Sequence, residues 1–158
     1  MFARKFLILL AAFGISIGVA AAEHRHSHEH GTAPAKLGLD NGKKWPTDEA
    51  LRQGMGNIRS TMAASLQGIH ENRLSQAQYA ELAKKVQDEV GNIVAHCRLE
   101  PRADAQLHIV VADIVGGAEA MAGPAKKVAR QRGALRIIGA LDRYDAHFDH
   151  PGWKAMAH

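Results

Sequence analysis

Residues Trp45 to Ile69 read WPTDEALRQGMGNIRSTMAASLQGI and carry the periodicity of an amphipathic helix. Thr47 is predicted to cap this helix, with Asp48 and Glu49 in the first turn, where negative charge suits the helix dipole. We expect the helix to run to about His70. Its apolar residues recur in steps of three and four, the spacing of one helix face rather than of a strand: Leu51, Met55, Ile58, Met62, Leu66 and Ile69.

Three further stretches have helical periodicity. Ser75 and Gln78 predict a capping box at the start of a second helix, and Pro101 suits the first turn of a third. Gly123-Pro124 ends the third helix and starts a fourth, which stops at His150-Pro151-Gly152. The stripes are Tyr79, Leu82, Val86, Val90, Ile93, Val94 and Cys97, then Leu107, His108, Val111, Ile114, Val115, Ala118 and Met121, and then Ala134, Ile137, Leu141, Tyr144 and Phe148.

Four helices with short connections and no strand pattern predict an all-α fold, an antiparallel up-down-up-down four-helix bundle. In that topology the residues before the first helix and after the fourth lie at the same end of the bundle. Trp45 and Trp153 occupy those two positions. We therefore expect both indoles at one end, where large aromatic rings would cover the core. The glycines inside the helices either weaken them locally or permit close helix approach.

The N-terminal residues have the pattern of a secretory signal peptide. Arg4 and Lys5 precede an apolar run from Phe6 to Val19, and Ala20-Ala21-Ala22 is a small-residue cleavage site. A retained N-terminal anchor is the alternative, although the run is short for a membrane span. We predict a signal peptide over residues 1–22, a disordered His-rich leader over 23–36 and the bundle domain over 37–158, in a periplasmic protein without stable membrane insertion after cleavage.

Charge and cysteine content limit the classes of partner. The formal net charge is +4, of which Arg4 and Lys5 contribute two, and the remaining basic and acidic residues alternate. Such a mixed surface argues against nucleic acid as the main partner. Cys97 is the one cysteine, so it cannot form an intramolecular disulfide and is buried, a ligand or open to an intermolecular bond.

The leader carries four histidines at alternate positions, His24, His26, His28 and His30. Neutral imidazole is a good ligand for copper, zinc and nickel, and nothing in the pattern selects among the three. We predict that this segment binds a transition metal ion. The alternative is a solubilising leader in which the histidines are incidental.

A second candidate metal site lies at what we call the near end: the start of the first helix, the end of the second, the start of the third and the end of the fourth. Soft sulfur and imidazole donors gather there, as a site between facing helices requires: Met55, Cys97, His108 and His147. Taken singly, each has a simpler interpretation. Methionine and cysteine on an apolar stripe pack as core residues, and a histidine at the edge of a stripe bonds to a neighbour.

We see no pattern of catalytic residues and expect a non-catalytic protein. The serines have no nucleophile-elbow context, and no Gly-rich loop joins a strand to a helix. Asp113 is an isolated mid-helix carboxylate, and we expect it to pair with a basic side chain. The alternative to metal binding is a metal-free structural or protein-interaction module.

Three motifs carry a resemblance over nearly the whole mature chain: LxLDNGKKWPTDEALRxGM at Leu37–Met55, IVAHCRLEPRADAxLH at Ile93–His108 and FDHPGWK at Phe148–Lys154, where x is any residue. The chain resembles a family of small exported proteobacterial proteins, some of which carry the name DnrO. The resemblance implies a periplasmic helical domain and brings no activity or ligand set with it.

A weaker architectural similarity is to the small periplasmic b-type cytochromes. These are four-helix bundles with a methionine early in the first helix and a histidine late in the fourth, positions that Met55 and His147 loosely resemble. The similarity implies a b-type haem electron carrier as a further alternative. The chain has no C-x-x-C-H motif for covalent haem attachment.

Overall fold

Five helices make up the described part of the chain in the computed structural model, which covers residues 36–124 and 126–157. The helices are α1 (Glu49–Ala64), α2 (Leu66–His70), α3 (Gln76–His96), α4 (Pro101–Ala122) and α5 (Lys127–His147). No strand occurs among these residues, where pairing is limited to two isolated β-bridges. The predicted all-α class is confirmed. The predicted signal peptide and the histidine-rich leader, apart from Lys36, lie outside the described residues.

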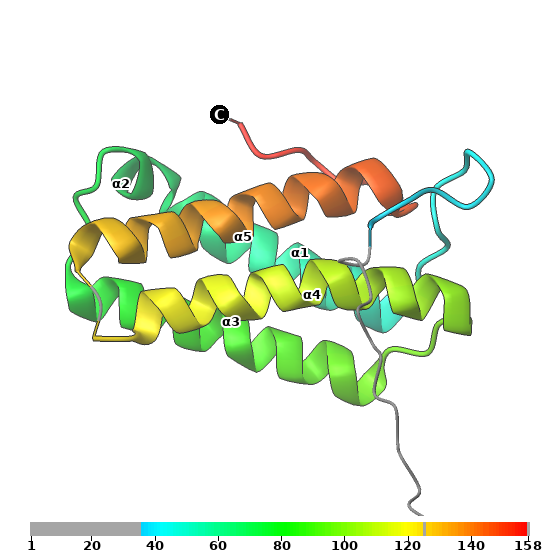
Figure 1. The fold of residues 1–158 in the computed structure, drawn as a ribbon, viewed down its shortest axis with the longest axis horizontal. Coiled ribbons are helices and arrows are strands. Elements are labelled where there is room, and N and C mark those ends of the chain that lie inside the picture. Colours follow the sequence, from blue (N-terminus) through cyan, green and yellow to red (C-terminus); the bar gives the residue numbers. More distant parts are fainter. Residues whose placement is uncertain (1–35, 125, 158) are drawn as a thin grey trace, which may run out of the picture. The chain divides into compact units, whose positions relative to one another are not determined.

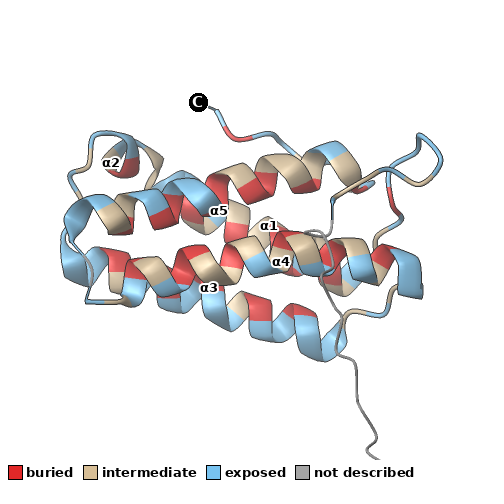
Figure 2. Cartoon of the chain, viewed as in Figure 1, coloured by how far each residue is buried: buried red, intermediate tan, exposed pale blue. Residues whose placement is uncertain are grey.

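The four long helices lie side by side (Figure 1). Helix α4 packs against both α3 and α5, α3 also packs against α1, and α1 contacts α5. Their facing sides carry the buried residues (Figure 2). Leu51, Met55, Ile58 and Met62 of α1 have no exposed surface. Each long helix buries one continuous apolar stripe. Because burial of each large apolar side chain contributes about 1.5–3 kcal/mol, these stripes stabilise the observed packing of the helices.

The first helix begins and ends differently from the prediction. Asp48, not Thr47, is the N-cap: its Oδ1 accepts a hydrogen bond from the amide of Leu51 at 2.7 Å. The Thr47 hydroxyl instead donates to the carbonyl of Asp149 at 2.6 Å. The helix stops at Ala64, and after a turn at Ser65 the short helix α2 continues the apolar pattern. The predicted single helix is therefore two.

The other boundaries follow the sequence signals closely. Ser75 and Gln78 form the predicted capping box, and Pro101 occupies the first turn of α4. Helix α5 starts at Lys127, three residues beyond Pro124. Val94 was placed on the buried stripe of the second predicted helix, but it is 70% exposed. The buried face of α3 is narrower than predicted. Ile93 packs against Gly54 of α1, whereas the adjacent Val94 lies outside this contact.

Close approach explains the glycines at the crossing of α4 and α5. A Cβ on Gly133 would lie 2.6 Å from the carbonyl oxygen of Gly117, and a Cβ on Gly117 would lie equally close to the carbonyl oxygen of Gly133. Both glycines are buried. Helix α4 runs unbroken through Gly116 and Gly117, so Gly117 and Gly133 permit the close approach of the two helices without interrupting α4.

Helix α4 is the most apolar of the described helices. By length and composition alone it could cross a membrane. Its Leu107, Val110, Ile114 and Met121 are buried in the core that α4 shares with its neighbours. The packing of α4 between α3 and α5 buries 33% of its most apolar stretch.

Candidate functional site

The near end is assembled by contacts between segments far apart in sequence. The amide of Trp45 donates to the carbonyl of His147, and the amide of Asp149 donates to the carbonyl of Trp45, each at 2.8 Å. The amide of Arg98, in the α3–α4 connection, donates to Oδ2 of Asp48 at 2.5 Å. The start of α1 thus touches the ends of α3 and α5, which is the grouping that the sequence predicted.

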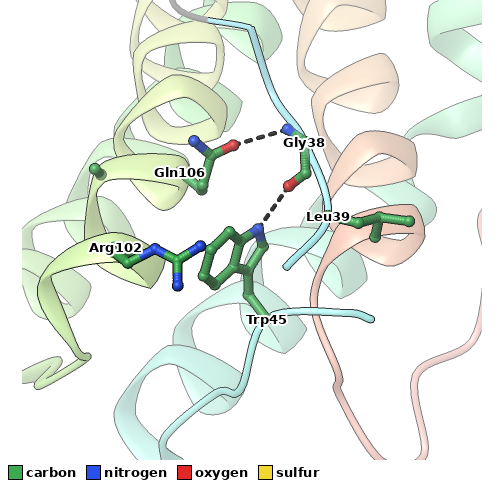
Figure 3. Close-up of a pocket in the computed structure, with 6 residues that line it drawn as sticks. Gly38, Leu39, Trp45, Arg102 and Gln106 are labelled. Atoms are coloured by element: carbon green, nitrogen blue, oxygen red, sulfur yellow. Dashed lines mark hydrogen bonds between the residues drawn. The ribbon is translucent and has the colours of Figure 1, made fainter. Parts of the chain in front are cut away.

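Residues 37–45 form a strap across the first turns of α4 (Figure 3). The Gly38 amide donates to Oε1 of Gln106 at 2.8 Å, and the indole Nε1 of Trp45 donates to the Gly38 carbonyl at 2.6 Å. The Arg102 guanidinium lies 5.3 Å from the centre of the Trp45 ring and pairs with Asp40. The indole itself is buried, so this strap holds Trp45 over the near end of the core.

Trp153 lies at the same end. Its ring packs on Tyr144 of α5 with centroids 5.0 Å apart and on His150 at 4.9 Å. The Tyr144 hydroxyl hydrogen-bonds to Nδ1 of His150 at 3.0 Å. Burial and the nearby Arg52 charge lower the pKa of His150, which favours the neutral ring. The expectation that Trp45 and Trp153 lie at one end of the helical domain is confirmed.

Cys97 follows α3 as its C-cap and is half-buried. Its thiol hydrogen-bonds to the Asp48 carboxylate. Burial chiefly, and then the Asp48 and Asp104 charges, raise the pKa of Cys97 to about 12. The thiol is therefore protonated at neutral pH, and because a metal ligand must be a thiolate, metal binding by Cys97 would have to displace this proton.

His108 is exposed on α4. Its Nδ1 lies 2.9 Å from the backbone carbonyl of Asp104 and 3.4 Å from the Asp104 carboxylate. Both acceptors favour the tautomer with hydrogen on Nδ1, which leaves the Nε2 lone pair free for a ligand. Metal-binding histidines are commonly oriented in this way. His108 has the right environment for an imidazole ligand.

Cys97 and His108 line one groove of about 270 Å³ between α3 and α4, together with Asp104. The remaining lining residues are apolar: Ile93, Val94, Leu107 and Val111. Among the described residues, however, no three His, Cys, Asp or Glu side chains are placed to hold a metal ion together. The groove offers one imidazole beside a protonated thiol, which does not amount to a closed coordination sphere.

Met55 and His147 are not among the residues that line this groove. Met55 is fully buried on α1. His147 is half-buried in the last turn of α5, with its Nδ1 2.8 Å from the carbonyl of Arg143. Of the four predicted near-end ligands, the structure thus brings Cys97 and His108 into one groove and leaves the other two in separate surroundings.

Asp113 has the structural role that its isolation in the sequence predicted. Its carboxylate bonds Arg136 at 2.8 Å and Arg143 at 2.5 Å, which links α4 to α5. Burial would raise the pKa of Asp113, but the hydrogen bonds and charges of the two arginines outweigh it and lower the pKa. This carboxylate is an ionised interhelical contact.

Sequence reasoning missed two residues of the near end, Asp48 and Asp104. Asp48 was assigned to the first turn of the helix, and its bonds to Arg98 and Cys97 join positions about 50 residues apart. No local pattern encodes such a contact. Asp104 could have been found, because it lies four residues before His108 and the two share one face of a helix.

Comparisons of the chain with protein-family models, with curated proteins and with solved structures gave no match. The resemblance to the exported DnrO-like family and the similarity to b-type cytochromes stay predictions.

Proposed function

We propose that this is an exported periplasmic protein, an antiparallel up-down-up-down four-helix bundle, that binds or buffers a transition metal ion without catalysis. The topology is supported by the sequence of helix contacts, in which each long helix packs on its neighbour along the chain and α1 contacts α5. The contact of the Trp45 backbone with His147 and Asp149 supports it further.

The observation that carries the proposal is the spacing of His24, His26, His28 and His30. Four imidazoles within seven residues supply enough donors for one copper, zinc or nickel ion. The soft ligands of the leader are imidazoles, because residues 23–36 contain no cysteine. Export would remove the signal peptide and leave these histidines next to the new N-terminus.

Within the bundle we assign a secondary role to His108. It is exposed, and its Nδ1 is already occupied by Asp104. An ion bound through Nε2 would sit at the mouth of the groove that Cys97 lines. We expect this position to bind more weakly than the leader, since the groove brings a single imidazole.

A metal titration of the exported chain tests the proposal. Protein freed of metal is titrated in turn with Cu(II), Zn(II) and Ni(II) by calorimetry, as wild type and with all four leader histidines changed to Asn. The tightest binding event should disappear in the fourfold variant. His96→Asn is the control, because His96 is an exposed histidine outside the leader whose Nδ1 lies on a backbone carbonyl, and it should leave the titration unchanged.

The alternatives give different results in the same experiments. A fourfold variant that binds metal as tightly as wild type would refute the assignment to the leader, and a wild type that binds none of the three ions would favour the metal-free interaction module. The apolar groove beside the exposed Val94 suits such a module. A Soret band in protein purified from its own periplasm would instead indicate the b-type haem carrier.

A further inference from the structure

The chain leaves α5 through a tight turn that places His150 against Trp153. The Trp153 amide donates to the His150 carbonyl at 3.1 Å, and Gly152 between them has a φ of 80°. A proline followed by a glycine with positive φ is typical of a type II turn. The two rings lie with their centroids 4.9 Å apart. The turn thus fixes the imidazole beside the indole.

Beyond this turn the C-terminal segment, residues 150–157, contacts both α5 and α1. The Trp153 ring packs on Tyr144 of α5, and the Lys154 carbonyl accepts a hydrogen bond from the Arg59 guanidinium of α1. Met156 is buried and belongs to the hydrophobic core. Figure 1 shows the segment running back alongside α5. Its departure from the helices would expose the Met156 side chain and the apolar surface beneath it.

His150 provides the acceptor that the buried Tyr144 hydroxyl needs. The Tyr144 residue is fully buried, and its hydroxyl lies 3.0 Å from Nδ1 of His150. Within the described part of the chain, this is the one hydrogen bond of that hydroxyl. The hydroxyl hydrogen requires a lone pair on Nδ1, which a neutral imidazole offers in one tautomer. A protonated imidazole carries hydrogen on both nitrogens and would leave the buried O–H without an acceptor, which opposes protonation.

The phenol itself stays a donor at neutral and mildly acidic pH. Burial chiefly raises the pKa of Tyr144 against the lowering effect of the Arg52 charge. Cys97 and Asp48 add to the rise, and neither titrates near neutral pH, because the pKa of Cys97 is raised to about 12 and that of Asp48 is lowered. His150 is therefore the group of this cluster that changes its protonation state in mild acid.

Two charged groups on the packed helices act on His150. Arg52 of α1 opposes a positive imidazole, whereas Asp145 of α5 favours it and is itself paired with Lys44 at 3.5 Å. Burial first, and then the Arg52 charge, lower the pKa of His150 below its ordinary value near 6.5. The charged residues nearest to it along the chain are exposed: Asp149 and Lys154. The packed position therefore favours the neutral ring.

We propose that His150 is a pH-sensitive latch: its neutral imidazole holds the C-terminal segment against α5 and α1, and its protonation in mild acid releases the segment. In the released state the ring lies in water and takes up a proton at its ordinary pKa. Because the held state binds the proton less readily, the ratio of released to held segment should rise about threefold to tenfold between about pH 7.5 and about pH 5.5. The latch is separate from the histidines of the proposed metal function.

Oxidation of Met156 by hydrogen peroxide measures the release. The exported chain is treated in EDTA, which keeps metal from the leader, and the mass of the C-terminal peptide gives the oxidation rate. A buried thioether reacts when it becomes exposed, so the rate follows the released fraction. The rate at Met156 should rise about threefold to tenfold between about pH 7.5 and about pH 5.5. Met62, fully buried on α1, is the internal control and should react equally slowly at both pH values.

Three variants separate the latch from a merely structural contact. His150→Gln keeps an acceptor for the Tyr144 hydroxyl but takes up no proton, so the rate at Met156 should become independent of pH. Tyr144→Phe removes the O–H that requires a neutral ring, so the pKa of His150, measured by NMR of the ring, should rise toward its ordinary value and the response should shrink. His147→Gln is the matched control, because His147 is half-buried at the same helix end with its Nδ1 on a backbone carbonyl. It should retain the wild-type response.

Several results would overturn the proposal. These are a wild-type rate at Met156 that changes less than about twofold over this pH range, a response that persists in His150→Gln, and a response that disappears in His147→Gln. Met62 oxidising in step with Met156 would show that acid opens the whole helical domain instead. Should His150→Gln fail to fold, Tyr144→Phe decides the question, because an unchanged response there would show that this hydrogen-bonded pair is not the sensor.

Discussion

Asp48 is the residue on which three segments of the near end meet. Its carboxylate accepts hydrogen bonds from the backbone amides of Leu51, which caps α1, and of Arg98. It also forms a hydrogen bond with the Cys97 thiol. Burial alone would raise the pKa of Asp48, but the two backbone hydrogen bonds, the thiol and the Arg52 charge outweigh burial and lower it. The ionised carboxylate therefore holds the α3–α4 connection to the start of α1.

The sign of the pH dependence follows from this lowered pKa. Because the folded pKa of Asp48 lies below its unfolded value, near 3.9, the carboxylate contributes stability that is fully present above that value. The contribution is lost as the pH falls through the folded pKa. We predict that Asp48→Asn lowers the free energy of unfolding by about 1 kcal/mol at pH 7, because the charge-assisted hydrogen bonds are weakened, and that wild type and variant converge in acid once the pH lies below the folded pKa of Asp48.

Urea denaturation at a series of pH values measures this difference. Asp88→Asn is the control, because Asp88 is an exposed carboxylate on α3 paired with Lys84 at 2.6 Å, and such pairs contribute about 0.3–0.5 kcal/mol. An offset between wild type and Asp48→Asn that stays constant from pH 7 through the whole acid range, until the carboxylate is protonated in the folded state, would show that the ionised carboxylate is not what stabilises the near end.

The sequence could not identify Asp48 as the cap for a physical reason. Thr47 and Asp48 are both good N-cap residues, and the choice depends on where the chain enters the bundle. The Thr47 hydroxyl donates to the carbonyl of Asp149, 102 residues away in the sequence. Asp48 therefore serves as the N-cap. The burial of Arg130, which is 7% exposed, gave no signal either, because an arginine on a helix is expected to be exposed.

Among the elements, the α4–α5 pair depends most on small residues. Gly117 and Gly133 let the two backbones approach, and Asp113 joins the same helices through Arg136 and Arg143. Ala at position 133 would place its Cβ against backbone atoms that cannot move independently. We predict that Gly133→Ala destabilises the fold by about 1–3 kcal/mol, the usual effect of overpacking a core.

Gly139→Ala provides the contrast within the same helix. Its Cβ would meet only the end of the flexible Arg143 side chain, at an ordinary 3.6 Å. With no clash, the higher helix propensity of alanine should stabilise the protein by about 0.5–1 kcal/mol. Thermal and urea unfolding of the two variants measure both effects. Equal stabilisation by both substitutions would mean that α4 and α5 do not cross at the glycine pair.

The helices themselves were predictable because each buries one apolar stripe and two of them have strong start signals. The capping box at Ser75 and the proline at position 101 mark boundaries that the structure keeps. The break at Ser65 was not predictable, since Leu66 and Ile69 continue the apolar spacing of α1 across it. The exposed Val94 shows the other limit, because spacing alone does not tell how wide a buried face is.

In the whole molecule, the segments that directly precede α1 and directly follow α5 close the same end of the core. Trp45 enters before α1, and Phe148 pairs with it after α5 in an isolated parallel bridge. The chain beyond His150 then returns along the helices. The Lys154 carbonyl accepts a hydrogen bond from the Arg59 guanidinium, and the Met156 side chain is buried. Met156 lies outside every predicted stripe, so its burial depends on tertiary contact alone.

The two tryptophans at this end should contribute unequally. Trp45 is 6% exposed, bonds the Gly38 carbonyl and holds residues 37–45 against α4, whereas Trp153 is half-buried on Tyr144 and His150. We predict that Trp45→Ala lowers the free energy of unfolding by about 3–5 kcal/mol, the range for large aromatic side chains in a core. Trp153→Ala should cost about 1–2 kcal/mol, in proportion to its smaller buried area.

Urea unfolding followed by circular dichroism gives both values without relying on the fluorescence that the substitutions remove. Equal losses, or a larger loss for Trp153, would mean that the strap formed by residues 37–45 does not secure the near end of the core.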